Sequence, residues 1–366
     1  MPNTHNPWGI HNGVASGVLA AASRTRSAIP DDTKMLRAAA DLTRTLSTAN
    51  PAIYWPDMLA SALIGYGALA GAILAQNVAL AIGCAILSMM ALYRAASFIH
   101  ELTHIRKGAL PGFRFGWNLL VGIPLMIPSF LYEGVHTQHH ARTRYGTAED
   151  PEYLPLALMK PWSLPLFIVV AALAPVGLIL RFGVLTPLSL LIPPLRRKVV
   201  AEFSALSINP AYRRRAPEGA FARMWHWQEA GACLFALALV GSVFAFGWKP
   251  LLVYMAIHSA MTVINQLRTL VAHLWENEGE AMTVTAQYLD SVNVPPPGTL
   301  PELWAPVGLR YHALHHLLPS VPYHNLAAAH RQLMATLDID SPYRQGNYTG
   351  MFPLVAKIAR STMHAR

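Results

Sequence analysis

The sequence predicts an all-α integral membrane protein with four to six transmembrane helices and a helical cap on the cytoplasmic side. Hydrophobic residues occupy 53% of the 366 positions and charged residues only 13%, whereas roughly a quarter of a soluble domain is charged. Several apolar runs are long enough to cross a bilayer, which takes about 20 residues. The net charge is +9 with the histidines neutral, and such an excess usually faces the cytoplasm.

The composition argues against several other classes. Nucleic acid is a poor partner, because the basic residues flank apolar spans and form no stripe interleaved with aromatics. Cys84 and Cys233 lie in apolar stretches, so we interpret them as core residues rather than a disulfide or thiolate site. The small-residue stretch 13–23 has no basic segment before it, which disfavours a cleaved signal peptide.

Residues 1–50 are predicted to be a cytoplasmic or interfacial segment, followed by a membrane domain at 51–335 and a cytoplasmic tail at 336–366. Within the first segment, 31–46 has acidic residues at its start and Arg44 near its end, as expected of an amphipathic helix. We expect this helix to lie at the membrane interface.

The first two apolar runs, about 52–75 and 78–99, predict a hairpin that returns the chain to the cytoplasm at His100. Gly67 and Gly71 form a GxxxG pattern, which favours close helix packing. Arg94 lies near the end of the second run, where its side chain could extend towards the headgroups.

The later runs include one complete hairpin and one ambiguous stretch. Residues 229–247 and 250–268 flank the turn GWKP and predict two crossings. Residues 117–132 are short and contain two prolines, so a re-entrant or interfacial segment is expected. Keeping the basic stretch 196–223 inside requires 162–195 to be a partly broken hairpin or an interfacial segment.

Eight of the sixteen histidines fall into three groups, each just beyond a membrane segment. Their spacings are H-x3-H, H-x2-HH and H-x2-HH, and residues three or four apart share one face of a helix. On the predicted topology all three groups lie on the cytoplasmic side. The groups are His100 and His104; His136, His139 and His140; and His312, His315 and His316.

Clustered imidazoles suit iron, zinc, copper or nickel. Eight ligands exceed the need of one ion and suit two ions with four or five nitrogens each, whereas a catalytic zinc usually takes three protein ligands. His273, just after the last span, is a candidate ninth ligand, with a hydrogen-bonded structural role as the alternative. A cap of surface histidines without metal is the alternative for the three groups.

Acidic residues near the first two groups could accept the second N–H of a metal-bound histidine, or could be solvated loop charges. Asn265 could hold a water near a metal, although helix packing is the simpler role. The candidate acids are Glu101, Glu133, Glu149 and Asp150. We expect structural roles for the remaining histidines, which are His5, His11, His226, His258, His324, His330 and His364.

The motifs HELTH, HTQHH and HALHH resemble, in order and spacing, the three histidine boxes of the membrane-bound fatty acid desaturases and their hydroxylase relatives. The continuation HHLLPSVPYHNL is similar to that of acyl-lipid desaturases, and TAEDPEY is similar to loops of bacterial members and alkane hydroxylases. The resemblance covers roughly residues 50–335. These boxes are specific for the superfamily and weakly specific for substrate or outcome.

The resemblance implies two non-haem irons with histidine-only protein ligands, dioxygen as co-substrate, and a separate electron donor such as ferredoxin or rubredoxin with its reductase. It also implies a further histidine at the end of the last span, which His273 matches. Animal acyl-CoA desaturases have an asparagine four residues earlier, where this chain has Thr269, so that water-mediated contact does not carry over. No HPGG haem-binding stretch is present.

The leading hypothesis is therefore O2-dependent desaturation of the acyl chain of a lipid or activated fatty acid, in a bacterial inner membrane with the boxes cytoplasmic. A hydroxylase or acetylenase on the same site is the alternative. A metal transporter or sensor is a remote rival, because its histidines should line a path through the spans. Basic residues 196–215 could contact a headgroup, a carrier protein or the membrane surface.

Overall fold

The computed structural model describes residues 28–106, 108–156, 159–298 and 300–364, and over these ranges it is helical with three isolated β-bridges. Five helical stretches in these ranges are long and apolar enough to cross a membrane. They are Pro51–Leu74 (α3), Val78–His104 (α4), Ser163–Leu191, Gly219–Phe246 (α10) and Trp248–Leu270 (α11). The predicted helical membrane fold is confirmed, and the cytoplasmic side of the cap stays a prediction. Stretch 13–23, His5 and His11 lie outside the described residues.

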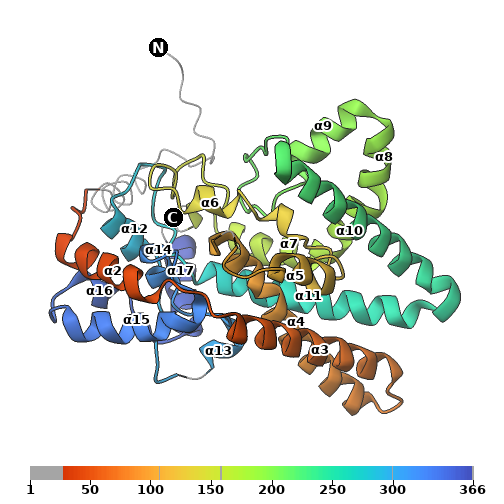
Figure 1. Ribbon diagram of the computed structural model, residues 1–366, viewed down its shortest axis with the longest axis horizontal. Coiled ribbons are helices and arrows are strands. Elements are labelled where there is room, and N and C mark those ends of the chain that lie inside the picture. Colours follow the sequence, from red (N-terminus) through yellow and green to blue (C-terminus); the bar gives the residue numbers. More distant parts are fainter. Residues whose placement is uncertain (1–27, 107, 157–158, 299, 365–366) are drawn as a thin grey trace.

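Helices α3 and α4 form a closely packed hairpin that projects from the rest of the molecule (Figure 1). A Cβ on Gly71 would lie 3.0 Å from the sulfur of Cys84, and one on Gly65 would lie 2.6 Å from the side chain of Leu92. Gly67 faces open space. The GxxxG prediction therefore holds for Gly71 but not for Gly67, and Gly65 provides the other close contact.

Arg94 has a partner that the sequence pattern did not indicate. Its guanidinium donates to both carboxylate oxygens of Asp57, at 2.7 and 2.6 Å, and the hydroxyl of Tyr323 donates to the same carboxylate at 2.7 Å. The ion pair therefore consists of two charge-assisted hydrogen bonds, which are stronger than bonds between neutral groups. This contact ties the hairpin to the cap.

Residues 113–131 form three short helices, Phe113–Trp117 (α5), the π-helix Asn118–Gly122 (η1) and the 3₁₀ helix Ser129–Leu131 (η2). The segment packs against the last hairpin, where the hydroxyl of Tyr254 donates to the carbonyl of Pro124 at 2.8 Å and Phe130 stacks on Trp225. Its short helices and its turn agree with the re-entrant segment that the sequence predicts.

The stretch Ser163–Leu191 comprises α7 (Ser163–Ile179), a π-helix η4 (Leu180–Leu185) and α8 (Thr186–Leu191). The chain then reverses at Ile192 into α9 (Pro193–Glu202). Arg181 on η4 and Arg196 on α9 both pair with Glu229 on α10, at 2.6 and 2.7 Å. The two arms of this turn are therefore held together by one buried carboxylate.

The two ends of the region that contains this stretch lie close together. His139 precedes the stretch and His273 follows α11, and their rings lie 5.1 Å apart. If α10 and α11 both cross, the stretch Ser163–Leu191 and α9 together must leave and return on one side of the membrane. A partly broken hairpin and an interfacial segment both satisfy this condition, so the choice between them stays a prediction.

The remaining helices gather at one end of the hairpins as a cap (Figure 1). They are α2 (Thr33–Leu46), α6 (His136–His139), α12 (Val284–Asp290), α13 (Pro301–Trp304), α14 (His312–Leu317), α15 (Tyr323–Thr336), α16 (Pro342–Gln345) and α17 (Met351–His364).

The predicted amphipathic helix forms as α2, N-capped by Asp32. Its apolar face, with Met35 and Ala39 fully or almost fully buried, packs on α15. A position at the membrane interface stays a prediction. At the other end of the chain, α17 buries Leu354 and Ile358. The domain division at residue 335 stays a prediction.

Candidate metal centre

Nine histidines converge where the membrane helices meet the cap, and they divide into two clusters. Within each cluster, the candidate ligand atoms all lie within 4.8 Å of one another. The structure thus brings together all eight histidines of the three boxes and His273. The first cluster comprises His100, His104, His136, His140 and His315. The second cluster comprises His139, His273, His312 and His316.

Helical spacing explains how three motifs build two clusters. Residues four apart lie on the same face of a helix, and each such histidine pair serves a single cluster. His139 of the second box and His315 of the third box stand outside these pairs and serve the other cluster, so both boxes are shared between the clusters. Sharing two boxes holds the clusters side by side.

The nitrogen geometry fits metal ions. The Nε2 atoms of His136 and His140 lie 2.9 Å apart in the first cluster, and those of His273 and His312 lie 3.0 Å apart in the second. Ligand nitrogens about 2.0–2.1 Å from one ion lie roughly 3 Å from each other. A pair of neutral rings at this spacing can share one N–H···N hydrogen bond, whereas a cation can accept the lone pairs of four or five rings at once.

Burial also favours neutral, ligand-ready imidazoles. It holds the pKa well below the ordinary histidine value for His136, His140, His273, His312, His315 and His316. His139 differs, because burial disfavours its charged form but the adjacent carboxylate of Asp150 outweighs this and raises its pKa. A neutral ring offers the lone pair that a metal needs.

A buried acid and a partly buried acid orient the rings of the second box. Asp150 lies 2.9 Å from Nδ1 of His139 and is itself held by the backbone N–H groups of Gly146 and Glu152. Glu152 lies 2.8 Å from Nδ1 of His136, and burial raises its pKa to about 7. Binding Nδ1 in this way leaves Nε2 of each ring directed at its cluster.

A tyrosine relay performs the same task for His273. Its Nδ1 lies 2.8 Å from the hydroxyl of Tyr145, which donates to Asp290 at 2.9 Å. Tyr153 donates to the same carboxylate at 2.9 Å. Asp290 therefore acts on the ring of His273 through Tyr145.

An extended segment, 291–294, ties His273 to the third box. The N–H of Val292 donates to the carbonyl of Ala272, and the carbonyl of Val292 accepts the N–H of Ala313. The side chain of Asn293 accepts the N–H of Leu314 at 2.9 Å. These bonds fix the position of α14 relative to the end of α11.

The four acids proposed from sequence have different surroundings. Asp150 contacts His139, and Glu101 lies 3.8 Å from Nδ1 of His100 while bonding Tyr54 and the N–H of Tyr323. Glu133 pairs with Arg114, and the exposed Glu149 lies near Arg144. Asn265 accepts from Arg268 rather than pointing to a cluster.

Sequence reasoning missed Glu152, Tyr145 and Asp290. Glu152 carried a usable signal, since it lies two residues after Asp150 in the same TAEDPEY loop. No local pattern marks Asp290, because its partners Tyr145 and Tyr153 are more than 130 residues away in the chain.

Comparisons with known proteins agree with this geometry. The fatty acid desaturase family model matches residues 75–347. A ceramide hydroxylase of Caulobacter vibrioides is 49% identical over 332 residues, covering 90% of this chain and 94% of that protein. No solved structure matches. The chain therefore belongs to the fatty acid desaturase family, whose members include membrane oxidoreductases of lipids.

Proposed function

We propose that this chain is a histidine-ligated di-iron oxidoreductase that hydroxylates a hydrocarbon chain of a ceramide-class lipid with dioxygen. The observation that carries the proposal is the pair of buried histidine clusters. The 49% identity to a ceramide hydroxylase supports hydroxylation and this substrate class. The proposed ligands are His100, His104, His136, His139, His140, His273, His312, His315 and His316.

Two irons with open coordination positions would supply the oxidising power that an unactivated methylene requires. The chain itself contributes five nitrogens to one ion and four to the other. Asp150, Glu152 and Tyr145 hold the rings in the orientation that directs Nε2 inwards. Burial of the clusters excludes water that would otherwise compete with substrate.

Desaturation is the second candidate, and the family model favours it. Both reactions begin by removing hydrogen from one carbon of the chain. Desaturation then removes a second hydrogen from the neighbouring carbon, whereas hydroxylation places one oxygen atom on the first. The named relative shifts the proposal from the desaturase expected at first to the hydroxylase alternative. An acetylenase has no comparable support.

The location of the clusters disfavours a metal transporter. Their histidines gather at one end of the spans instead of following a path through the bilayer. Among the described spans, His258 is the histidine placed near the middle of a helix. The proposed setting is a bacterial inner membrane with the clusters cytoplasmic, where a soluble ferredoxin or rubredoxin could deliver electrons.

Lipid analysis of a bacterial host tests the proposal. The chain is expressed in cells supplied with ceramide, beside the same chain carrying His139→Ala and His140→Ala, and ceramides are analysed by mass spectrometry. A species one oxygen atom heavier, absent from the double variant, is expected. A species two hydrogen atoms lighter would instead establish desaturation.

A further inference from the structure

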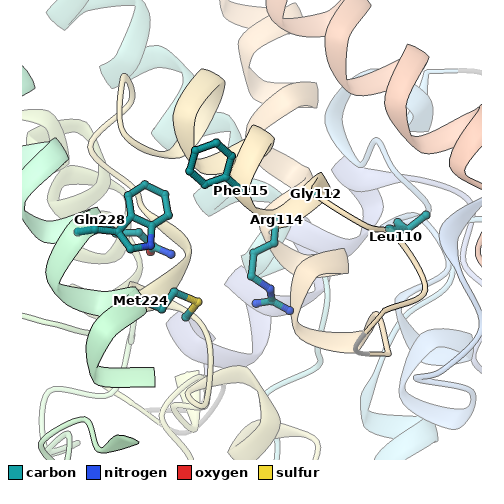
Figure 2. A pocket seen from close by; sticks show the side chains of 7 residues that line it. Leu110, Gly112, Arg114, Phe115, Met224 and Gln228 are labelled. Carbon is teal, nitrogen blue, oxygen red and sulfur yellow. The ribbon is translucent and has the colours of Figure 1, made fainter. Parts of the chain in front are cut away.

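We propose that a pocket between α5 and the start of α10 receives the uncharged polar headgroup of the lipid substrate, recognising its amide and hydroxyl groups. The inference rests on the proposed function, for which it names the substrate-recognition site. Figure 2 shows the pocket, a cavity of about 280 Å³. It is lined by Leu110, Gly112, Arg114, Phe115, Met224, Trp227 and Gln228, and we call it the headgroup pocket.

The polar end of the headgroup pocket connects to two histidine boxes. Arg114 donates through Nη2 to the carbonyl of Leu102 at 2.8 Å, and Leu102 lies between His100 and His104 in the chain. Arg114 also pairs with Glu133, three residues before the second box. A headgroup bound here is therefore anchored to the scaffold that carries the first cluster.

Charge favours a neutral headgroup over an anionic one. Arg114 is the charged side chain among the lining residues, and its pairing with Glu133 balances its charge. The side chain of Arg114 is still 34% exposed, so its N–H groups remain within reach of a ligand. An amide carbonyl and hydroxyl oxygens can accept from this guanidinium without adding a charge, whereas a phosphate would bring a negative charge close to the Glu133 carboxylate.

The walls of the headgroup pocket are mostly apolar. The rings of Phe115 and Trp227 lie 5.4 Å apart, and Phe115 is 59% exposed. Aromatic side chains of this kind favour the boundary between headgroups and hydrocarbon. The amide oxygen of Gln228 already accepts the N–H of Phe130 at 2.9 Å, so Gln228 shapes the pocket more than it binds.

The volume suits a headgroup and not a whole lipid. The cavity volume of about 280 Å³ lies just below the roughly 300–1,000 Å³ of pockets that enclose a whole small ligand. This is room for an amide, two hydroxyls and the first carbons of a chain. The two hydrocarbon tails must lie outside the headgroup pocket, in the bilayer or between helices.

Photolabelling tests binding without requiring turnover. The purified full chain in lipid nanodiscs is irradiated with a ceramide that carries a diazirine on the carbon next to its amide carbonyl, and labelled peptides are mapped by mass spectrometry. Label on residues 110–115 and 224–228 is expected, and excess unlabelled ceramide should remove at least 80% or so of it. Excess phosphatidylglycerol should remove little, because it lacks the amide and carries a phosphate.

A pocket-filling variant provides the kinetic test. Met224→Trp should raise the KM for ceramide about tenfold or more, with kcat changed less than about twofold, since it weakens ground-state binding without touching the clusters. Leu234→Trp, on the same helix but outside the headgroup pocket and 68% exposed, is the matched control and should leave KM unchanged. Metal content should equal that of the unmodified chain in both variants.

The outcomes separate this inference from the proposed function. Label confined to other segments, or competition by phosphatidylglycerol as strong as by ceramide, overturns the headgroup pocket even if ceramide is hydroxylated. Ceramide hydroxylation with an unchanged KM in Met224→Trp overturns it as well. Label on both segments that excess unlabelled ceramide removes, without any oxidised ceramide, supports the headgroup pocket and counts against the proposed reaction.

Discussion

The two histidine clusters are built in different ways from the same motifs. The first cluster takes His100 and His104 from α4, a helix of 27 residues that continues directly out of the membrane. The second takes no ligand from within a span, and its His273 follows the last residue of α11 by three positions. Helical rigidity therefore positions part of the first cluster, whereas the second depends on hydrogen bonds.

The hydrogen-bonded network of the second cluster is correspondingly larger. Asp150 holds His139, Tyr145 and Asp290 hold His273, and residues 291–294 fix α14. The second cluster also has four nitrogens where the first has five. Loss of a ligand or of a partner should therefore affect the second cluster more, and the following changes test that asymmetry.

Removing one ligand from each cluster should have the largest effect. In the double variant His139→Ala/His140→Ala we expect product formation to fall on the order of a thousandfold or more. Each metal ion loses one nitrogen ligand, and Asp150 loses the ring that it orients. Bound iron, measured by plasma mass spectrometry, should fall well below that of the unmodified chain. His226→Ala, at an exposed site on α10, is the control, and retained activity in the double variant would contradict the ligand assignment.

Single ligand variants compare the clusters directly. His273→Ala leaves three nitrogens in the second cluster and should lose about one iron per chain, whereas His104→Ala leaves four in the first and should retain more metal. Iron per chain after dialysis against a weak chelator measures the difference. Equal loss of iron in the two variants would contradict the proposed difference between the clusters.

Changing the partner of a ligand should have an intermediate effect. Asp150→Asn keeps the shape of the side chain but removes the charge that His139 contacts, and should weaken metal binding or activity roughly 10- to 100-fold. Glu149→Gln changes the adjacent exposed acid and should leave both unchanged. A metal titration followed by optical absorption compares the metal affinity of the two variants. Equal affinities would mean that Asp150 does not orient the ring of His139.

Breaking the tyrosine relay should have the smallest effect. Tyr145→Phe removes the hydroxyl between His273 and Asp290, a loss of about 1 kcal/mol per hydrogen bond or roughly fivefold in metal affinity. Ser291, whose Oγ lies 3.2 Å from Nδ1 of His273, can partly replace it. A further loss of metal affinity in Tyr145→Phe/Ser291→Ala, seen in the same titration, would show that Ser291 compensates for the missing hydroxyl. No loss of affinity in the double variant would exclude the relay.

The fold and the nine histidines could be predicted because their signals are local. Apolar runs mark the spans, and i, i+4 spacing marks each pair of ligands. His273 could be placed from the end of a span. Asp290 and Tyr145 could not, because their contact joins residues 145 positions apart in the chain.

Two further contacts could not be predicted for the same reason. Asp57, nearly two turns into the neighbouring helix, binds Arg94 across the hairpin. The apolar face of the helix at 33–46 meets α15 nearly 300 residues later. An amphipathic face specifies that something apolar will cover it, without specifying what.

The most direct test of the central claim is the fate of labelled dioxygen. The purified chain, loaded with iron in nanodiscs containing ceramide, is supplied with a ferredoxin, its reductase and ¹⁸O2, and the lipid is analysed by mass spectrometry. The account predicts a hydroxylated ceramide carrying one labelled oxygen atom, formed only when iron is present. A product without the label, or an alkene as the sole product, would contradict it.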